Sequence, residues 1–306
     1  MVAALKLAIT GGTGFVGARL LDAALAGGHS VRALIRRPQP ARDGVTWVDG
    51  ALDRPDCLDA LVAGADAVIH VAGVVNSPDA AGFEAGNVIG TGAVLAAAEK
   101  AGIARFVHVS SLAAREPRLS LYGASKSRSE ALVTDSPLSA AIVRPPAIYG
   151  PGDRELLEMF KMAARGLVLL PPPGRLSLLH ADDLARLLLA LAAPAAPSGL
   201  TVEPDDGRPG GWTHRDFADA LAAAVGRSKV GKLSMARPVL AAAARADRLL
   251  RGAKAKLTPD RAAYFSHPDW VADPACAVPS ELWSAQIPTE QGLADTAGWY
   301  RQAGWL

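Results

Sequence analysis

The 306-residue sequence predicts an α/β protein built on a doubly wound parallel sheet with helices on both faces. Three observations point to this fold. Strand-length apolar segments alternate with helical segments along the first half of the chain, as in successive βαβ units. The segment 67–72 is almost wholly apolar, as a parallel strand covered on both faces should be. The first strand runs through a glycine-rich turn directly into a helix, and right-handed crossovers of this kind produce a parallel sheet.

The expected elements follow one another in regular order up to residue 150. Strands are expected at Leu5–Ile9, Ser30–Ile35, Val45–Asp49, Ala67–Ala72, Arg105–Ser110 and Ser139–Val143. Helices are expected at Phe15–Ala26, Pro55–Val62 and Asn87–Ala101, and around Tyr122–Lys126. In the first helix the apolar residues recur three and four positions apart, which places them on one buried face. Gly73 ends the fourth strand at the carboxyl edge, where such sheets bind ligands.

The turn between the first strand and the first helix, Thr10–Gly17, reads Thr-Gly-Gly-Thr-Gly-Phe-Val-Gly. Glycine lets the turn close tightly, brings the backbone near a pyrophosphate and lets the helix pack directly on the strand. The free N–H groups and the positive end of the helix dipole then face the anion. A glycine-rich turn alone is often only a turn, but its place between a strand and a helix predicts a Rossmann-type dinucleotide site.

The end of the second expected strand bears on which dinucleotide binds. An acidic residue about 20 residues after the glycines would bind the ribose hydroxyls and favour NAD. No acid lies between Val31 and Arg42, and the strand runs instead into Arg36 and Arg37. A guanidinium suits the 2′-phosphate of NADP, because it binds phosphate through charge-assisted hydrogen bonds. We therefore expect NADP, bound through Arg36, with NAD as the alternative cofactor. If the two arginines have no role in binding, they are simply a solvated pair on a loop.

Composition and charge favour a soluble, cytoplasmic enzyme. The length suits one large or two moderate domains of about 150 residues. No segment is long and apolar enough to span a bilayer, and we expect no signal peptide before the first strand. The two cysteines, Cys57 and Cys276, exclude a disulfide framework and a cysteine zinc site. A net charge of +2 without basic runs gives no reason to expect nucleic acid as a partner.

A tyrosine and a lysine four residues apart are candidates for acid/base chemistry. Tyr122 and Lys126 share one helix face, so that the phenol and the ammonium can reach one site. A free tyrosine, with a pKa of about 10, is a poor base at neutral pH, and a lysine cation with a positively charged nicotinamide would stabilise its phenolate. Such a pair is common on surface helices. Combined with the glycine turn and the serines Ser110 and Ser111, it predicts a catalytic site.

The sequence resembles an extended short-chain dehydrogenase/reductase of the NAD(P)-dependent epimerase/dehydratase and 3β-hydroxysteroid dehydrogenase kind. The resemblance covers nearly the whole chain and rests on these motifs: Thr10–Gly17, His70–Gly73, Asn87–Thr91, Val109–Ser111, Tyr122–Lys126, Arg144–Gly152 and His180–Asp183. It implies a Rossmann domain at residues 1–150 and 175–198. It also implies a smaller, mostly helical substrate-binding domain at residues 151–174 and 199–306. Homodimers are frequent in this family, through the helices near Asn87 and Tyr122.

The resemblance implies a role for each residue of the site. Tyr122 would act as acid and base, Lys126 would hold the nicotinamide ribose and tune Tyr122, and Ser111 rather than Ser110 would bind the reacting oxygen. The turn would hold the pyrophosphate, and Pro145 would lie beside the nicotinamide. Together with Arg36, the expected cofactor-binding residues are Gly11, Thr13, Gly14, Phe15, Val16, Gly17, Leu52, Val71, Ala72, Gly73, Lys126 and Pro145. This chemistry requires no metal.

Three departures from the family pattern narrow the expected function. Gly50–Leu52 stands where many members have an aspartate that binds adenine, which leaves only the backbone of Leu52 for this contact. Leu112–Ala113 stands where sugar-nucleotide dehydratases carry an Asp-Glu pair, so dehydration is not expected. Ala147 stands where many sugar-nucleotide epimerases have an asparagine that holds the diphosphate. We therefore expect an NADP-dependent oxidoreductase that acts on a small, apolar ketone or alcohol.

Two other functions stay open at this stage. A nucleotide-sugar epimerase would use the same tyrosine and lysine with a cofactor that is retained through turnover. A sensor would bind NADPH without catalysis, although such relatives usually lack Tyr122 or Lys126.

The second half of the chain is expected to form the substrate side. Leu176–Leu179 and a helix at Asp182–Leu191 resemble a return to the main sheet, with Asp182 or Asp183 as the helix cap. Elements expected in the smaller domain are a strand at Leu200–Glu203 and helices at Glu155–Arg165, His214–Val225 and Val239–Leu250. The last of these helices carries Arg245, Arg248 and Arg251 and offers three interpretations: a solvated face, a dimer surface or a weak membrane contact. His180 with the two aspartates is not expected to bind a metal.

Overall fold

The computed structural model describes residues 4–252, 255 and 257–306. The chain forms two compact units. The sheet unit comprises residues up to Pro145, Leu184–Glu203 and Cys276–Trp283. The C-terminal unit comprises Pro146–Asp183, Pro204–Ala275 and Ser284–Leu306. No helix in the described part of the chain is long and apolar enough to cross a membrane.

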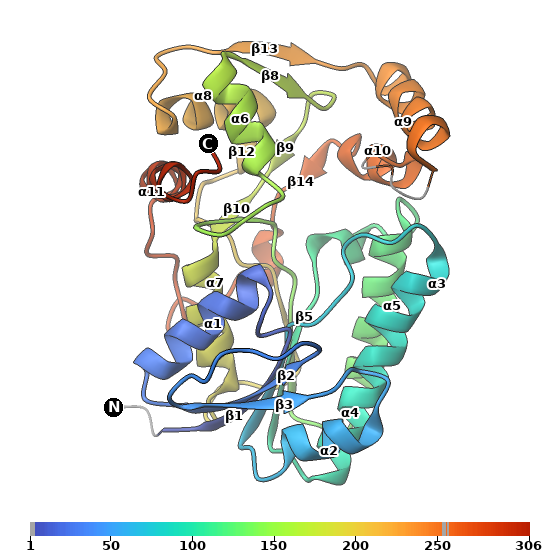
Figure 1. Ribbon diagram of the computed structural model, residues 1–306, viewed down its shortest axis with the longest axis vertical. Helices are drawn as coiled ribbons and strands as arrows, with labels where there is room; N and C mark the ends of the chain where they lie inside the picture. The colour runs from blue at the N-terminus through green and yellow to red at the C-terminus, as the bar shows by residue number, and fades with distance from the viewer. Residues whose placement is uncertain (1–3, 253–254, 256) are drawn as a thin grey trace. The chain divides into compact units, whose positions relative to one another are not determined.

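A seven-stranded parallel sheet forms the centre of the sheet unit, in the order β11-β6-β5-β4-β1-β2-β3 (Figure 1). Its strands are β1 (Lys6–Thr10), β2 (Ser30–Ile35), β3 (Val45–Asp49), β4 (Ala67–His70), β5 (Arg105–Val109), β6 (Ala140–Val143) and β11 (Leu200–Val202). All four residues of β4 are buried, which explains its apolar sequence. The strand order reverses between β1 and β4, and open sheets of this kind bind their ligands at such a point.

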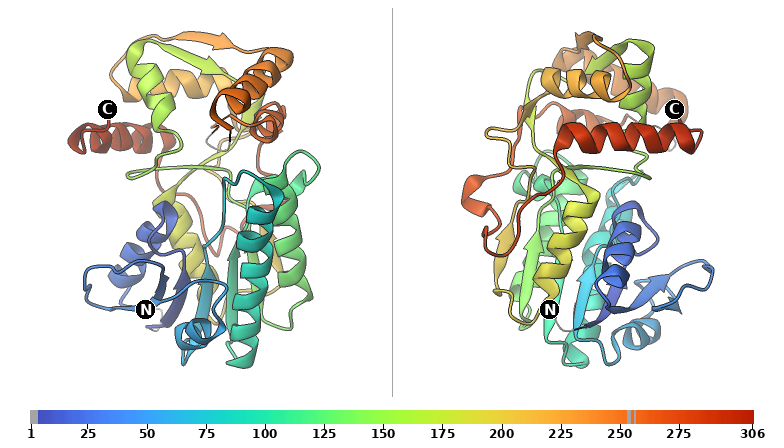
Figure 2. Two further views of the ribbon diagram at one scale, coloured as in Figure 1. Left: turned by 45° about the vertical axis from the view of Figure 1, so that its right-hand side comes forward. Right: turned by 90° about the vertical axis from the view of Figure 1, so that its left-hand side faces the viewer.

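Helices cover both faces of this sheet (Figures 1 and 2). They are α1 (Phe15–Ala26), α2 (Pro55–Val62), α3 (Ala80–Phe83), the π-helix η1 (Glu84–Ile89), α4 (Gly90–Lys100), the 3-10 helix η2 (Leu112–Arg115), α5 (Leu121–Asp135) and α7 (Ala181–Ala192). α1 and the part of α7 from Leu184 onward lie on one face, and α2, α4 and α5 lie on the other. Leu58, Val94 and Val133, one from each of these three helices, join one buried core with the sheet residue Phe106. The doubly wound architecture predicted from the sequence is therefore confirmed.

The C-terminal unit combines helices with short strands. Its elements are β7 (Ala147–Tyr149), α6 (Leu157–Arg165), β8 (Leu167–Leu170), β9 (Arg175–Leu176), β10 (Leu178–His180), β12 (Trp212–Thr213), α8 (His214–Ala224), β13 (Gly231–Ser234), α9 (Arg237–Arg251), α10 (Pro259–Phe265), β14 (Asp269–Trp270) and α11 (Thr289–Gln302). A 3-10 turn, η4 (Pro274–Cys276), lies where the chain passes from this unit into the sheet unit. Aromatic residues build the core of the C-terminal unit, where Phe160 and Tyr300 pack edge to face with ring centroids 5.1 Å apart. The Tyr300 hydroxyl donates a 2.7 Å hydrogen bond to the Asp153 carbonyl.

Three expectations about the second half differ from the structure. β11 pairs with β6 at the edge of the main sheet, whereas a strand at Leu200–Glu203 was expected in the smaller domain. Leu176–Leu179 does not return to that sheet, because β9 pairs with β12 and β14, and β10 pairs with β7. α7 begins at Ala181, so both aspartates lie inside its first turn instead of preceding it. The Asp183 carboxylate accepts hydrogen bonds from the backbone N–H groups of Gln286 and Ile287.

Candidate active site

The glycine turn after β1 has a shape that only glycine permits at two positions. Gly11 has a φ of 74°, and a Cβ there would lie 2.7 Å from the backbone nitrogen of Ala72. A Cβ at Gly17 would lie 2.0 Å from the carbonyl oxygen of Gly11. The turn is closed by the Gly14 N–H, which donates a 3.0 Å hydrogen bond to that same carbonyl. Backbone therefore packs on backbone here, and α1 begins immediately afterwards at Phe15.

This turn fits the pyrophosphate of a dinucleotide. Gly14 occupies the N-cap of α1 and offers no side-chain oxygen to the first N–H groups of the helix. These groups, with the positive end of the helix dipole, are an anion site. Thr13 and Gly14 are exposed, and Phe15 and Val16 are half-buried at the start of the helix. Val71 and Ala72 follow β4 and are tied to the turn, since the Ala72 N–H donates a 3.2 Å hydrogen bond to Thr10 Oγ1.

The remaining expected cofactor residues lie at several places in the sheet unit. Arg36 follows the last residue of β2 and is exposed. Leu52 is half-buried and packs on the core cluster that α2 and α4 share. Pro145 is buried two residues after β6, and its carbonyl accepts a 3.1 Å hydrogen bond from the Leu112 N–H.

Tyr122, Lys126 and Ser111 meet at the carboxyl ends of β4 and β5. Ser120 caps α5 by accepting a 2.9 Å hydrogen bond from the Gly123 N–H, which fixes the start of the helix. Tyr122 and Lys126 follow in its first two turns, and the side chain of Ser111 lies near the Tyr122 hydroxyl. Lys126 is buried, and its Nζ donates a 2.9 Å hydrogen bond to the Val109 carbonyl at the end of β5.

Gly73 keeps the space beside this lysine open. A Cβ at Gly73 would lie 3.1 Å from Lys126 Nζ and 3.1 Å from Asn87 Oδ1. On another side of the site, the ring of Phe83 packs against Tyr122 with centroids 6.2 Å apart. The site thus combines a phenol, a hydroxyl and a buried ammonium within one small region.

Burial controls the ionisation of both groups on α5. It raises the pKa of the Tyr122 phenol, and the nearby hydroxyl of Ser111 opposes that rise. It lowers the pKa of Lys126 to about 8, against an opposing effect from the Glu130 carboxylate. The pKa of Tyr122 therefore lies above its usual value, so that the phenol is protonated at neutral pH.

Asn87 has a structural role that the sequence argument did not assign. It lies in the π-helix η1, where the extra residue in the turn directs the amide toward the site. Its Oδ1 accepts a 2.6 Å hydrogen bond from the Val74 N–H, and its Nδ2 donates to Ser125 Oγ at 2.8 Å. Asn87 thereby joins the loop after β4 to the helix that carries Tyr122. The signal available in the sequence was the Asn87–Thr91 motif alone.

Hydrogen bonds to two threonines hold the buried ring of His70, the last residue of β4, in one tautomer. The Thr91 hydroxyl donates to the Asn87 carbonyl at 2.6 Å, so it accepts from the Nε2–H of His70 at 3.0 Å. Nδ1 then accepts from the Thr10 hydroxyl at 2.7 Å. The ring stacks on that of His108 with centroids 5.5 Å apart. Burial, with a smaller effect of the Lys126 charge, lowers the pKa of His70 to about 3.

An ion-pair network joins the ends of β5, β6 and β11 to α5, and the sequence argument missed it. Arg144, directly after β6, donates to both carboxylate oxygens of Glu130 and pairs with Glu203 at 3.3 Å. Arg115 pairs with Glu203 at 3.1 Å, and the Ser110 hydroxyl donates to Glu130. Ser110 is therefore engaged away from Tyr122, whereas Ser111 lies near the Tyr122 hydroxyl. In the sequence, the position of Glu130 four residues after Lys126 was the one sign that the two side chains share a helix face.

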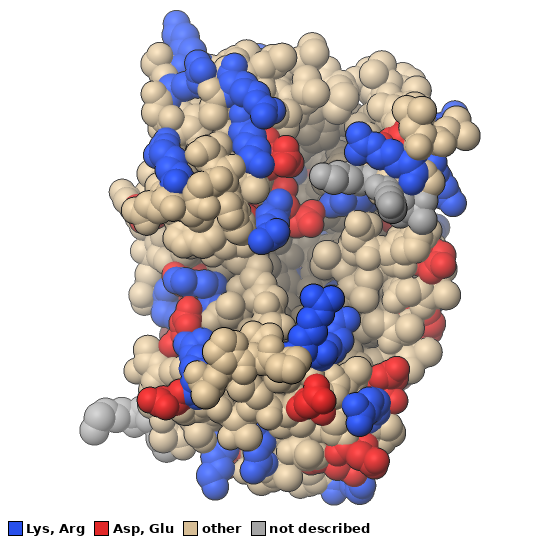
Figure 3. All heavy atoms as spheres, viewed as in Figure 1, with Lys and Arg blue, Asp and Glu red and all other residues tan. Residues whose placement is uncertain are grey.

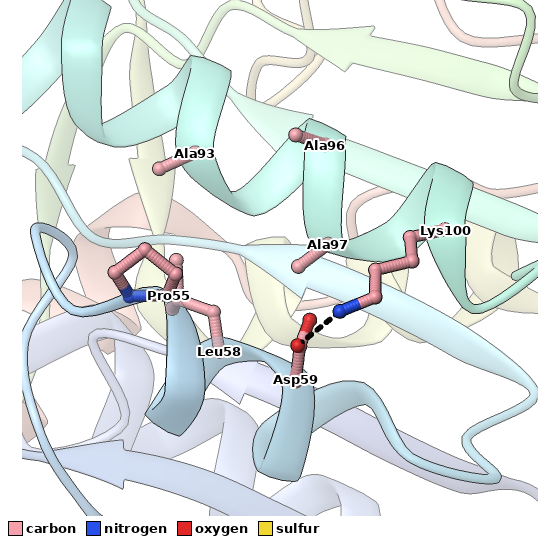
Figure 4. A pocket seen from close by; sticks show the side chains of 7 residues that line it. All are labelled: Pro55, Leu58, Asp59, Ala93, Ala96, Ala97 and Lys100. Atoms are coloured by element: carbon pink, nitrogen blue, oxygen red, sulfur yellow. Dashed lines mark hydrogen bonds and ion pairs between the residues drawn. The ribbon is translucent and has the colours of Figure 1, made fainter.

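A hollow of about 210 Å³ lies between α2 and α4 and has no group of catalytic side chains like the one around Tyr122 (Figure 4). Its lining consists of Pro55, Leu58, Asp59, Ala93, Ala96, Ala97 and Lys100. The two charged residues pair with each other across its rim. Over the described residues, no group of three or more His, Cys, Asp or Glu side chains is placed to hold a metal ion.

Comparison with known proteins gives this site its context. Residues 7–199 match the NAD dependent epimerase/dehydratase family. The chain is 40% identical over 309 residues to a ceramide reductase of Caulobacter vibrioides, covering 98% of this chain and 96% of that protein. It is 33% identical over 261 residues to a 2-alkyl-3-oxoalkanoate reductase of Stenotrophomonas maltophilia, covering 74% and 78% of the two chains.

Among solved structures, the Bordetella bronchiseptica enzyme WbmG in complex with NAD and UDP has the same fold. The two chains superpose with a TM-score of 0.76 at 19% identity, covering 99% of this chain and 97% of WbmG. Fold, family match and reductase relatives agree. The chain therefore belongs to the NAD dependent epimerase/dehydratase family and is an NAD(P)-dependent enzyme of the extended short-chain dehydrogenase/reductase type.

Proposed function

We propose that this enzyme is an NADPH-dependent ketoreductase for a long-chain lipid of the ceramide class. The observation that carries the reaction is the position of the Tyr122 phenol, which lies near Ser111 and one helical turn from the buried side chain of Lys126. The substrate class rests on the 40% identity to a ceramide reductase, which extends over nearly the full length of both chains. A ceramide carries carbinol carbons, and this site is suited to interconverting a carbinol and a ketone.

Each side chain of the site has one task in this proposal. Tyr122 donates its proton to the carbonyl oxygen, and Ser111 donates a hydrogen bond to the same oxygen as negative charge develops there. Lys126 supplies a positive charge that favours the phenolate left behind. When bound, the nicotinamide supplies the hydride to the carbonyl carbon. The hydride and the phenolic proton together convert the ketone to the carbinol.

Arg36 is proposed to select NADPH over NADH. It is exposed directly after β2, at the position where an acid would favour NAD, and its guanidinium suits a 2′-phosphate. Fluorescence titration with NADPH and NADH tests this selection. Arg36→Ala should weaken NADPH binding roughly tenfold or more while leaving NADH binding nearly unchanged, since hydrogen bonds to a charged group contribute about 1.5–3 kcal/mol. The exposed neighbour Arg37→Ala is the matched control. Equal weakening of both cofactors would exclude Arg36 as the 2′-phosphate ligand.

Turnover is tested by following NADPH consumption with the ketone form of a ceramide and, in parallel, with UDP-sugars. We expect consumption only with the lipid ketone. Tyr122→Phe should lower kcat roughly 10²–10⁴-fold and leave the Kd for NADPH unchanged, because the phenol acts in proton transfer. NAD(H) that stays bound through purification, together with conversion of UDP-sugars, would instead identify an epimerase. Full biological activity of the Tyr122→Phe variant would identify a sensor.

A further inference from the structure

The helix α9 turns an apolar face outward. It packs against α10 through a small cluster that contains Leu240, Ala244 and Ala262. The opposite side is formed by Pro238, Val239, Ala242, Ala246, Leu249 and Leu250, all of them exposed. At 3.6 residues per turn these six span an arc of about 120°, which we call the outer face of α9. The exposed fraction reaches 87% at Leu249 and 86% at Leu250. A surface helix normally presents polar residues on this side.

Arginines lie on one flank of α9. Arg237, Arg245 and Arg248 are exposed there. Arg245 borders the outer face, whereas Arg237 and Arg248 lie about 80–100° beyond its edge, toward the side that packs on α10. The single acid of α9, Asp247, is directed away from the outer face, where it accepts from the Leu257 N–H and pairs with Arg251 at 3.1 Å. Figure 3 shows Lys and Arg side chains beside uncharged surface in the part of the molecule where Figure 1 places α9 and α10. Leucines flanked by arginines are typical of helices that lie in a membrane interface.

We infer that the outer face of α9 docks onto the surface of an anionic lipid bilayer. The leucines would enter the boundary between head groups and acyl chains, while the arginine stems lie along it and their guanidinium groups reach the phosphates. A 15-residue helix is too short to span a bilayer, so it lies in the surface plane. A second copy of the chain fits less well, since a stable protein interface takes about 20–30 residues on each side and the outer face has six.

The inference rests on the proposed function in one respect: docking would bring the enzyme to a substrate that resides in a membrane. Binding to lipid can therefore be measured without turnover. The full-length chain is floated with vesicles of phosphatidylcholine alone and of phosphatidylcholine with phosphatidylglycerol. We expect the protein to float with the anionic vesicles and much less with the neutral ones. The Tyr122→Phe variant should float equally well, which separates this result from any failure of the proposed reaction.

Substitutions on the two parts of the surface should act differently. Leu249→Ser/Leu250→Ser should reduce the fraction bound to anionic vesicles at least tenfold, because the apolar anchor is lost. Arg245→Gln/Arg248→Gln should weaken binding roughly fivefold per arginine and abolish the preference for anionic lipid. Leu233→Ser removes a leucine of 56% exposure from β13 in the same unit and should leave binding unchanged. NADPH titration and circular dichroism check that each variant is folded.

Two outcomes would overturn the inference. If the wild-type chain does not float and Leu249→Ser/Leu250→Ser changes nothing, the outer face is merely solvated. If light scattering shows a dimer that this double variant converts to a monomer, and no vesicle binding is found, a second copy covers the face instead.

Discussion

Arg144 binds Glu130 through two hydrogen bonds, of 2.9 Å from Nε to Oε1 and of 2.7 Å from Nη2 to Oε2. Glu130 lies one helical turn after Lys126 on α5, and its charge raises the pKa of that lysine against the effect of burial. The same carboxylate accepts the Ser110 hydroxyl. This pair therefore links the ends of β5 and β6 to the helix that positions Tyr122 and Lys126, and its carboxylate favours the charged form of the lysine.

Loss of the guanidinium should destabilise the fold strongly. Arg144→Met leaves Glu130, which is 7% exposed, without its ionic partner, and removal of one member of a buried pair costs about 3–5 kcal/mol. Urea unfolding measures this cost. The double variant Arg144→Met/Glu130→Met should recover much of the loss, since no buried charge is then left unpaired. A double variant that is less stable than Arg144→Met would contradict this explanation.

The pH profile of ketone reduction should report on Lys126. Tyr122 stays protonated through neutral pH because burial raises its pKa, so it does not limit the reaction there. Lys126, with a pKa lowered to about 8, loses its charge as the pH rises through that value, and kcat should fall with a midpoint near it. Glu130→Gln removes the carboxylate that favours the ammonium and should move the midpoint to lower pH. A profile unchanged in this variant would show that Lys126 does not set the alkaline limit.

The glycine turn allows a matched pair of substitutions. Gly17→Ala would bring a Cβ to 2.0 Å from the Gly11 carbonyl oxygen, so the backbone must move, and we expect a loss of about 1–3 kcal/mol in stability with much weaker NADPH binding. Gly92→Ala, on α4, meets nothing closer than 3.7 Å and should be neutral or stabilising because alanine favours the helix. Unfolding curves and NADPH titration compare the two. Unchanged NADPH affinity in Gly17→Ala would argue against this turn as the pyrophosphate site.

The sheet unit could be predicted from the sequence almost to its element boundaries. α1, β2, β3 and α2 have the predicted bounds, because each is marked by local apolar periodicity and by a glycine or proline within two residues of an end. The helix expected at Asn87–Ala101 is divided in the structure, because the π-helix η1 covers its first three residues and α4 begins only at Gly90. Periodicity alone contains no signal for that interruption.

The C-terminal unit shows where sequence reasoning ends. β9 is two residues long and owes its existence to pairing with β12 and β14, more than 30 residues away in the chain. Likewise β11 joins the main sheet through β6, a partner about 60 residues earlier. Such short strands are defined by tertiary contacts and not by local propensity. The role of Glu130 on α5 likewise depends on a tertiary contact, the hydrogen bonds from Arg144 at the end of β6.

His70 should make the enzyme sensitive to acid. The ring is fully buried as the neutral Nε2–H tautomer, and its pKa is lowered from 6.5 to about 3. Between these values the unfolded chain binds a proton that the folded chain does not, so the free energy of unfolding falls as the pH falls through this window. Each pH unit costs at most about 1.4 kcal/mol. His108 beside it has a pKa lowered for the same reason, burial, and contributes in the same direction.

Replacement of the ring separates this titration from other acid effects. His70→Gln keeps a donor for Thr91 and an acceptor for Thr10, but it cannot be protonated in this range. The variant is expected to start less stable at pH 7, because the stacking on His108 is lost, and then to lose stability more slowly than the wild type as the pH falls from 6.5 toward 4. Urea unfolding at several pH values measures both slopes. Parallel slopes would mean that His70 is not the buried group whose protonation unfolds the chain, and His108→Gln would be examined next.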